Sequence, residues 1–370
     1  MKELMQILQN VFDLKGGNTM QMVKTKGALK ARGVDVELSL DLRSNVPGYD
    51  VARLFNLTRV QEQETFVQTR SARAGKPVVL STIYWHTEEF GRNAAVGLRG
   101  FPGRHLSIDA MECLKAAGKF VLRGERGEGA RHLITHSYRQ MQREILDACD
   151  VFLPNPEAEM DQIETHLGFS SENYVVVPNA VDTKSIRAAR ADGSSKYEKY
   201  KVRLVCIGRI DIRKNQMNLI RALDGSDYKI VFVGKKSPGH RGYADEVVRA
   251  IQANPNMEWI EQIPNEDVYK LCRACKVSVL PSWFETPGLV SPEAAAMGCN
   301  IVVSPEGTTR DYFGGSAYYC DVSDLAPIRA AIDEAYAVPM TKLLARRCFA
   351  RTPGSVRPRR PWKATKWRWG

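Results

Sequence analysis

Two pairs of charged residues in the second half of the sequence have the types and spacing needed to bind a phosphorylated sugar. Arg209 and Lys214, separated by four residues, follow the apolar run VRLVCI, and Glu285 and Glu293, separated by seven, enclose the sequence TPGLVSP. Arginine and lysine can hold a diphosphate, and carboxylates accept hydrogen bonds from sugar hydroxyl groups. Each residue alone also has an explanation without a ligand, because loop cations are common and the helix dipole favours glutamate in a first turn.

The two glutamates lie in a stretch that reads as a strand, a turn and a helix. An apolar strand is predicted at 276–280, and a helical pattern begins near Gly288 and ends at Gly298. The unpaired amide groups of that helix start would point outward at the carboxyl end of a strand, where an open α/β sheet binds anions. This arrangement suits a sugar attached to a phosphate.

Strands and helices alternate along both halves of the chain, which predicts two α/β domains with parallel sheets. A chain of 370 residues is too long for one ordinary domain. Predicted strands are 4–12, 34–40, 51–57, 77–83, 151–153, 174–177, 202–207, 228–233, 257–260, 276–280 and 300–303; predicted helices include 18–32, 107–117, one ending near 149, 156–167, one beginning near 215, 242–253, 266–275 and 325–336. We divide the chain into an N-terminal Rossmann-like domain (1–183), a polar linker (184–200), a C-terminal Rossmann-like domain (201–336) and a tail (337–370).

Two features of the first half are candidates for the same site. Gly16 and Gly17 form a turn between the first strand and the first helix, where a ligand could approach the backbone closely. His86 follows the strand at 77–83, although a histidine there is more often structural. The Gly- and Arg-rich stretch 88–132 could meet an anionic acceptor or could simply be solvated.

The positive charge is concentrated at the C-terminus. The formal net charge is +11, and residues 341–370 hold ten Lys or Arg and no Asp or Glu, so the remainder is close to neutral. Nucleic acid is therefore not an expected partner. We predict that the tail is disordered. It is either an unrelated, frameshifted coding end or an Arg- and Trp-rich segment that lies on an anionic membrane.

Composition argues against a metal centre and a membrane span. Cys272 and Cys275 form a CxxC, but no second pair or His cluster accompanies them, and most of the eight cysteines lie in apolar runs typical of buried thiols. No run of eighteen apolar residues occurs, and the first residues carry polar side chains where a signal peptide is apolar. We expect a cytoplasmic protein, with contact at the inner face of the membrane left open by the tail.

Several motifs resemble the family 4 retaining glycosyltransferases with the GT-B fold. These are GRIDIRKN at 208–215, ETPGLVSPE at 285–293, the Gly16-Gly17 loop, PNAVD at 178–182 and the position of His86, and together the resemblance covers about residues 1–336. The sequence departs from the family pattern at Pro287, where an aromatic residue is frequent, and at Ala180, usually Gly. The helix that normally crosses back onto the N-terminal domain is not recognisable after Tyr336.

The resemblance implies transfer of a sugar from a UDP- or GDP-sugar to a saccharide or lipid-linked acceptor in cell-surface polysaccharide synthesis, with retention and without a cofactor or metal. It implies that Arg209 and Lys214 bind the diphosphate, Glu285 the transferred sugar and Glu293 the ribose. The implied catalytic set is Arg209, Lys214, Glu285 and His86, and the implied donor-binding set is Gly16, Gly17, Gly208, Gly288, Leu289, Val290 and Glu293. A non-catalytic GT-B protein that binds sugar nucleotides and a GT-B sugar-nucleotide epimerase are the alternatives.

Overall fold

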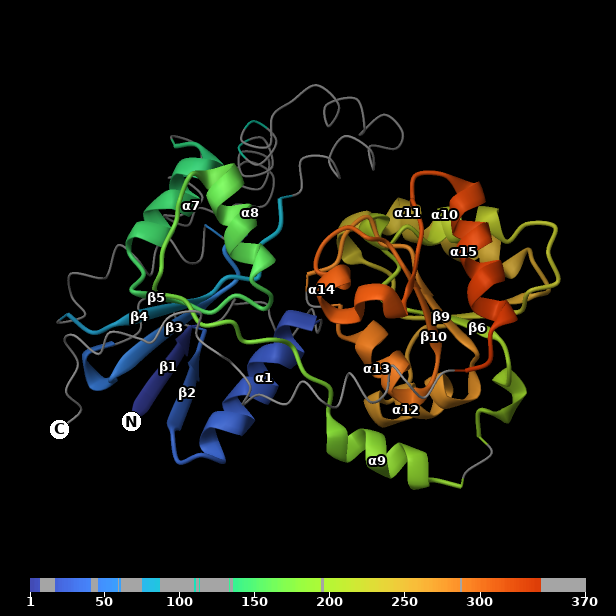
Figure 1. The fold of residues 1–370 in the computed structure, drawn as a ribbon, viewed down its shortest axis with the longest axis horizontal. Helices are drawn as coiled ribbons and strands as arrows, with labels where there is room; N and C mark the ends of the chain where they lie inside the picture. Colours follow the sequence, from blue (N-terminus) through green and yellow to red (C-terminus); the bar gives the residue numbers. More distant parts are fainter. Residues whose placement is uncertain are drawn as a thin grey trace.

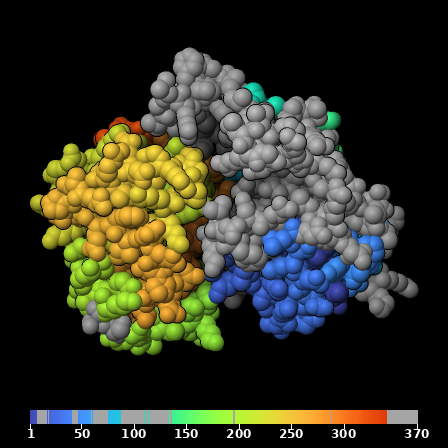
Figure 2. Space-filling view, turned by 180° about the vertical axis from the view of Figure 1, so that it is seen from behind, coloured from blue at the N-terminus to red at the C-terminus, as the bar shows by residue number. Residues whose placement is uncertain are grey.

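The computed structural model describes residues 1–6, 17–40, 46–58, 60, 75–86, 110, 113, 133, 136–193, 196–286 and 288–340. Gly16, Pro287, nearly all of the stretch 88–132 with its predicted helix, and the tail from 341 lie outside the described residues, and so do the predictions made for them. The described residues form two α/β domains that lie side by side (Figure 1). Figure 2 shows the two domains from behind.

The N-terminal domain is built on a five-stranded parallel sheet of order β2-β1-β3-β4-β5. This is a doubly wound order in which the chain reverses direction across the sheet between β1 and β3, and such a switch point is where open α/β sheets bind ligands. The strands are β1 Lys2–Gln6, β2 Asp35–Ser39, β3 Val51–Phe55, β4 Val78–Ser81 and β5 Val151–Phe152.

Side-chain alternation along these strands builds two apolar layers, as expected for a sheet covered on both faces. Leu4, Leu54 and Leu80 pack with α7 (Tyr138–Asp147) and α8 (Ala158–Leu167) on one face. The opposite face places Met5, Val36 and Phe55 against Met22 of α1 (Gly17–Lys30). Figure 1 shows α7 and α8 on one side of the sheet and α1 on the other.

The C-terminal domain has a six-stranded parallel sheet of order β11-β10-β9-β6-β7-β8. Read from β8, this is the strand order 3-2-1-4-5-6 of dinucleotide-binding folds, with the switch point between β6 and β9. The strands are β6 Leu204–Ile207, β7 Ile230–Val233, β8 Met257–Ile260, β9 Val277–Leu280, β10 Asn300–Val303 and β11 Tyr318–Tyr319.

Two groups of helices cover the C-terminal sheet on opposite sides (Figure 1). In the first group, α13 (Val290–Met297) lies against β9 and β10, and α9 (Thr183–Ala191) and α12 (Asn265–Ala274) pack on α13 and on each other. The second comprises α10 Gln216–Ala222, α11 Arg241–Gln252 and α15 Leu325–Ala337. The remaining elements are the short helix α14 (Thr309–Phe313) and the 3₁₀ turns η1 Val46–Gly48, η3 Glu198–Tyr200, η4 Ile212–Lys214, η5 Pro238–His240 and η6 Gly314–Ser316.

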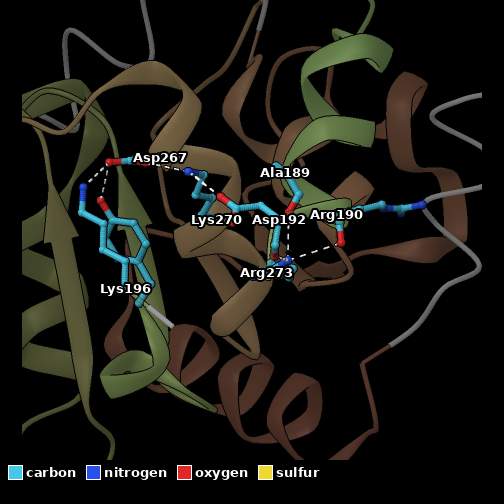
Figure 3. Close-up of polar contacts among 8 residues, drawn as sticks. Ala189, Arg190, Asp192, Lys196, Asp267, Lys270 and Arg273 are labelled. Carbon is cyan, nitrogen blue, oxygen red and sulfur yellow. Dashed lines mark hydrogen bonds and ion pairs between the residues drawn. The ribbon is translucent and has the colours of Figure 1, made fainter. Parts of the chain in front are cut away.

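The segment 184–200, predicted as a linker, is largely part of the C-terminal domain. Helix α9 buries Ile186 and Ala189 in the core of that domain. Arg273 of α12 donates to the carbonyl oxygen of Ala189 at 2.9 Å, and Lys270 pairs with Asp192 at 2.6 Å (Figure 3). The polar composition of the segment concealed an amphipathic helix, whose last carbonyl groups need donors and find one in Arg273.

Most of the other predicted elements are confirmed, with ends shifted by at most two residues where those ends are described. The predicted strand 174–177 is corrected, because it forms only an isolated bridge between Phe152 and Tyr174. The predicted strand 4–12 begins at Lys2, and Gln6 is its last described residue. Among the described helices, none has the length and apolarity needed to cross a membrane.

Candidate functional site

The site is built at the switch point of the C-terminal sheet. Gly208 follows β6 and Pro281 follows β9, and these two strands are neighbours in the sheet. The chain after β6 turns through η4, which begins after Asp211 because that carboxylate accepts a hydrogen bond from the Arg213 amide at 3.0 Å. Lys214 is the last residue of η4 and is therefore fixed at the carboxyl edge of the sheet.

Lys214 and Glu285 form a direct ion pair between Nζ and Oε1, across 71 positions of sequence. Their side chains are only 14% and 5% exposed, so the pair is largely withdrawn from water. Burial alone would raise the pKa of Glu285, but the charges of Lys214 and Arg213 outweigh it and hold that pKa below its usual value. The pKa of Lys214 is lowered by burial, an effect that Glu285 opposes. Contact with Lys214 therefore favours the carboxylate form of Glu285, while Glu285 in turn favours the charged form of Lys214 against the effect of burial.

The backbone around Glu285 is held by two neighbouring loops. The Thr308 amide donates to the Glu285 carbonyl at 2.8 Å, and the Trp283 amide donates to the Arg213 carbonyl at 2.9 Å. Gly307 lies against Glu285 with a φ of +88°, and a Cβ at that position would come within 2.1 Å of the Glu285 carbonyl oxygen. Only glycine fits there, so the contact fixes the carboxylate relative to the loop after β10.

The helix behind Glu285 starts at Val290, two residues later than predicted. The first amides that bond within the turn are those of Ser291, to the Gly288 carbonyl, and of Glu293, to the Leu289 carbonyl. The amide groups of Gly288, Leu289 and Val290 therefore precede the hydrogen bonds of this turn, as those at a helix start do. An anion beside them would also be favoured by the helix dipole.

Glu293 belongs to a different set of contacts. Tyr269 of α12 donates from Oη to Glu293 Oε1 at 2.9 Å. Burial raises the pKa of Glu293 to about 7, while the Tyr269 hydrogen bond and the charge of Lys24 lower it and the charge of Asp182 raises it. Within the described part of the chain, no hydrogen bond or ion pair joins Glu293 to Lys214 or Glu285.

Lys24 and Asp182 connect the two domains beside Glu293. Lys24 of α1 donates from Nζ to Asp182 Oδ2, and the other carboxylate oxygen caps α9 through the amides of Lys184 and Ser185, at 3.1 Å each. This hydrogen bond from Lys24 is the main reason that the pKa of Asp182 falls to about 2. Sequence reasoning missed Lys24 and Tyr269, because neither lies in a recognisable motif.

Arg209 follows Gly208 at the end of β6 and is not part of the Lys214–Glu285 pair. It is half-buried, and its carbonyl oxygen accepts a hydrogen bond from Gln216 at 2.8 Å. Across the described residues, its guanidinium group has no hydrogen bond or ion pair. Arg209 therefore carries a positive charge that is not committed to a carboxylate.

The N-terminal candidates lie at the corresponding edge of the other sheet. His86 follows β4 and stacks on His166 of α8, with ring centroids 3.7 Å apart and planes 3° from parallel. Gly17 begins α1 and is exposed. No described contact brings His86 or Gly17 to Lys214, Glu285 or Glu293.

A buried network that the sequence did not reveal holds the loop before His86. Glu159 of α8 is fully buried and accepts hydrogen bonds from Thr82 and from Asn155, the latter at 3.1 Å. Asn155 in turn accepts from Gln21 of α1 at 2.7 Å. Ile83, next to Thr82, has a φ of +41°, a left-handed conformation that a β-branched residue adopts only under constraint.

The described residues contain no cluster of three or more His, Cys, Asp or Glu that could hold a metal ion. Cys272, Cys275 and Cys299 are fully buried in the C-terminal core, and the Cys299 thiol donates to the Cys272 carbonyl at 2.9 Å. The CxxC is thus part of the hydrophobic core, in line with the sequence interpretation of buried thiols.

Comparison with known proteins finds similarity to glycosyltransferases. Residues 189–346 match the model of the glycosyl transferases group 1. A D-inositol 3-phosphate glycosyltransferase of Acidothermus cellulolyticus is 26% identical over 272 residues, which cover 69% of this chain and 58% of that protein. The chain spans about half the length of the curated relatives it matches.

Two solved structures share the fold over nearly the whole chain. Sucrose-phosphate synthase from Thermosynechococcus elongatus superposes with a TM-score of 0.68 at 15% identity, covering 95% of this chain and 94% of that one. An Escherichia coli trehalose-6-phosphate structure bound with UDP-2-fluoro glucose superposes with a TM-score of 0.60 at 12% identity, covering 94% and 93%. The protein has the GT-B fold of two Rossmann-like domains, and its residues 189–346 are similar to the glycosyl transferases group 1.

Proposed function

We propose that the protein is a glycosyltransferase that moves a sugar from a nucleotide-diphosphate sugar to an acceptor hydroxyl group with retention of configuration. The observation that carries the proposal is the direct Lys214–Glu285 contact beside the helix-start amides, at the switch point of the C-terminal sheet. A cation and backbone amides suit a diphosphate, and a fixed carboxylate suits sugar hydroxyl groups.

In this proposal Arg209 and Lys214 bind the diphosphate and stabilise its charge as the bond to the sugar breaks. The amides of Gly288, Leu289 and Val290 cap the phosphate. Glu285 binds the transferred sugar and Glu293 the ribose, while His86 and the Gly16-Gly17 loop approach from the N-terminal domain. The acceptor hydroxyl attacks from the face that the diphosphate leaves, so no covalent nucleophile is assigned.

No divalent metal is required by this mechanism. Lys214, the uncommitted charge of Arg209 and the helix start together neutralise the leaving diphosphate. We propose UDP- or GDP-sugars as donors and a saccharide or lipid-linked saccharide of cell-surface polysaccharide synthesis as the acceptor.

The experiment is a donor screen followed by product analysis. UDP- and GDP-sugars are ranked by thermal shift, and the best donor is incubated with saccharide and lipid-linked acceptors. NMR of the product then gives the anomeric configuration. Retained configuration supports the proposal, whereas inversion, isomerisation of the donor, or binding without transfer would each overturn it.

A charge-removing variant ties the activity to the site. Glu285→Gln is expected to lower transfer about 100-fold, since it replaces a charged carboxylate with a neutral amide. Glu246→Gln changes an exposed glutamate of α11 in the same way and should leave transfer unchanged. Equal activity of the two variants would remove Glu285 from the mechanism.

A further inference from the structure

Tyr269 is a buried residue that the proposed mechanism leaves without a role. It lies on α12, is 8% exposed, and donates its phenolic hydrogen to Glu293 Oε1 at 2.9 Å. Helices α12 and α13 pack against each other, so this hydrogen bond joins two rigid elements of the C-terminal core. The Glu293 carboxyl group is therefore oriented by a neighbour that lies on a separate helix.

The second carboxylate oxygen of Glu293 is left available. Within the described residues, Oε2 has no hydrogen bond, whereas Oε1 is held by Tyr269. The charged and titratable groups that act on this carboxyl come from three elements: Lys24 of α1, Asp182 before α9, and Tyr269 of α12. Because Lys24 is itself bonded to Asp182, their charges partly cancel at Glu293, and Tyr269 is its hydrogen-bond donor.

We propose that Tyr269 is a positioning residue that fixes the Glu293 carboxylate for bidentate acceptance of the 2′- and 3′-hydroxyl groups of a donor ribose. This inference rests on the proposed function, in which Glu293 faces the ribose. A carboxylate held by one oxygen cannot rotate freely, so it presents its lone pairs to a diol without a further loss of rotamer freedom on binding. Tyr269 therefore determines the preference for a ribonucleotide over a 2′-deoxyribonucleotide.

The first test is binding of UDP, GDP and ADP, each beside its 2′-deoxy counterpart, by calorimetry. Whichever base the wild-type protein binds, it should bind the ribonucleotide more tightly than the 2′-deoxyribonucleotide with the same base. Tyr269→Phe, which removes only the hydroxyl group, should raise the Kd of that ribonucleotide about 3- to 10-fold and raise that of the 2′-deoxy form, which keeps only the 3′-hydroxyl, by less. In turnover, the KM for the donor should rise while kcat stays within about 2-fold, since the ribose contact is made equally in the ground state and the transition state.

The matched control is Tyr228→Phe. Tyr228 also donates to a carboxylate, Asp333 Oδ1 at 2.7 Å, but this bond links the loop before β7 to α15. This variant should keep the ribose preference of the wild type. A double-mutant cycle guards against a merely structural effect, because Tyr269→Phe should add nothing to the Kd of Glu293→Gln. A further loss in the double variant, or an equal loss for both sugars, would overturn the assignment.

The pH profile supplies a readout that packing alone would not move. Binding needs the Glu293 carboxylate, so affinity should fall as the pH drops through about 7, where burial places this pKa. A hydrogen bond donated to a carboxylate stabilises its charged form. Tyr269→Phe should therefore move the midpoint to higher pH, and Glu293→Gln should flatten the profile. An unmoved midpoint in Tyr269→Phe contradicts the inference.

Failure of this inference is distinguishable from failure of the proposed function. If none of the three ribonucleotides binds, the proposed function and the role of Tyr269 are both wrong. If a ribonucleotide binds with a ribose preference that Tyr269→Phe removes, but no sugar is transferred, only the proposed function falls. If transfer occurs and the preference survives in Tyr269→Phe, only the role of Tyr269 falls.

Discussion

Each domain buries one acid–base pair against its sheet, and the two pairs behave in opposite ways. In the N-terminal domain, Glu3 of β1 lies beside Arg53 of β3, with side chains 6% and 9% exposed. In the C-terminal domain, Lys214 and Glu285 are 14% and 5% exposed. Burial is therefore similar, yet the pKa of Glu3 is raised and that of Glu285 is lowered.

The difference lies in the group to which each cation donates its hydrogen bonds. Arg53 donates from Nε and Nη2 to Ser81 at 3.0 and 2.9 Å, and approaches Glu3 Oε1 only to 3.8 Å. Burial consequently outweighs the attraction of Arg53 in setting the pKa of Glu3. Glu285 is instead in direct contact with Lys214, and Arg213 adds a second positive charge. Burial alone does not decide whether a carboxyl stays charged; contact with a cation does.

Removing the cation of the C-terminal pair should have the largest effect. Lys214→Met leaves the Glu285 charge buried without its partner, which should cost about 3–5 kcal/mol of unfolding free energy. Transfer should also fall 10²- to 10³-fold, since a charge that stabilises the leaving group is lost. Urea unfolding and donor turnover measure the two effects.

Arg209→Ala is the control that separates the loss of stability from the loss of transfer. It should reduce transfer on the same scale but change stability by only about 0.5 kcal/mol, because Arg209 has no carboxylate partner within the described residues. A Lys214→Met protein as stable as the wild type would contradict the buried-pair interpretation. Stability restored by adding Glu285→Gln, without activity, would support it.

Glu159 extends the comparison to a buried carboxyl that bonds to uncharged groups. Its neighbours Thr82 and Asn155 donate hydrogen bonds, but burial still raises its pKa from 4.5 to about 7. Because the folded pKa is raised, its contribution to stability is present below about pH 4.5 and is lost as the pH rises through 7. The loss amounts to about 3 kcal/mol. Glu159→Gln should remove this part of the pH dependence, measured by urea unfolding from about pH 4.5 to 8, and identical slopes in both proteins would refute it.

Glu3→Gln should have a smaller effect. At neutral pH the change in unfolding free energy should be within about 1 kcal/mol. The variant buries a neutral amide in place of a group that can be charged, and Arg53 keeps its two hydrogen bonds to Ser81. The raised pKa of Glu3 means that its stabilisation is lost as the pH rises above 4.5, so the variant should gain stability relative to the wild type as the pH increases from there. A loss of several kcal/mol at neutral pH would show that Glu3 is as tightly coupled to its cation as Glu285.

Chelation should have the smallest effect of all. With Lys214, Arg209 and the start of α13 available for the diphosphate, transfer in EDTA should match transfer without it. The measurement is the initial rate with and without EDTA, followed by addition of magnesium or manganese. Activity that disappears on chelation and returns with either ion would require a metal in the mechanism.

The sequence by itself determined the local elements and the kind of residue at the ends of strands. The apolar runs at 204–207 and 277–280, and the positions of Arg209, Lys214 and Glu285 just after them, were readable because strand periodicity and turn chemistry act over a few residues. The strand, turn and helix that carry Glu285 and Glu293 followed from the same local rules. The polar segment at 184–200 was misjudged because its helix α9 buries only Ile186 and Ala189, and Tyr197 and Tyr200 enter the core from outside that helix.

Only the tertiary structure decided which of these residues meet. Strand order makes β6 and β9 neighbours, and this brings Lys214 to Glu285 across 71 positions. The tertiary structure also places Glu293 in a hydrogen bond with Tyr269, apart from Glu285. It joins Lys24 of α1 to Asp182, which caps α9 of the C-terminal domain. Such pairings depend on the packing of whole helices and sheets, so the spacing of residues along the chain does not contain them. The charge state of each buried carboxyl follows from these contacts, and is therefore a property of the fold.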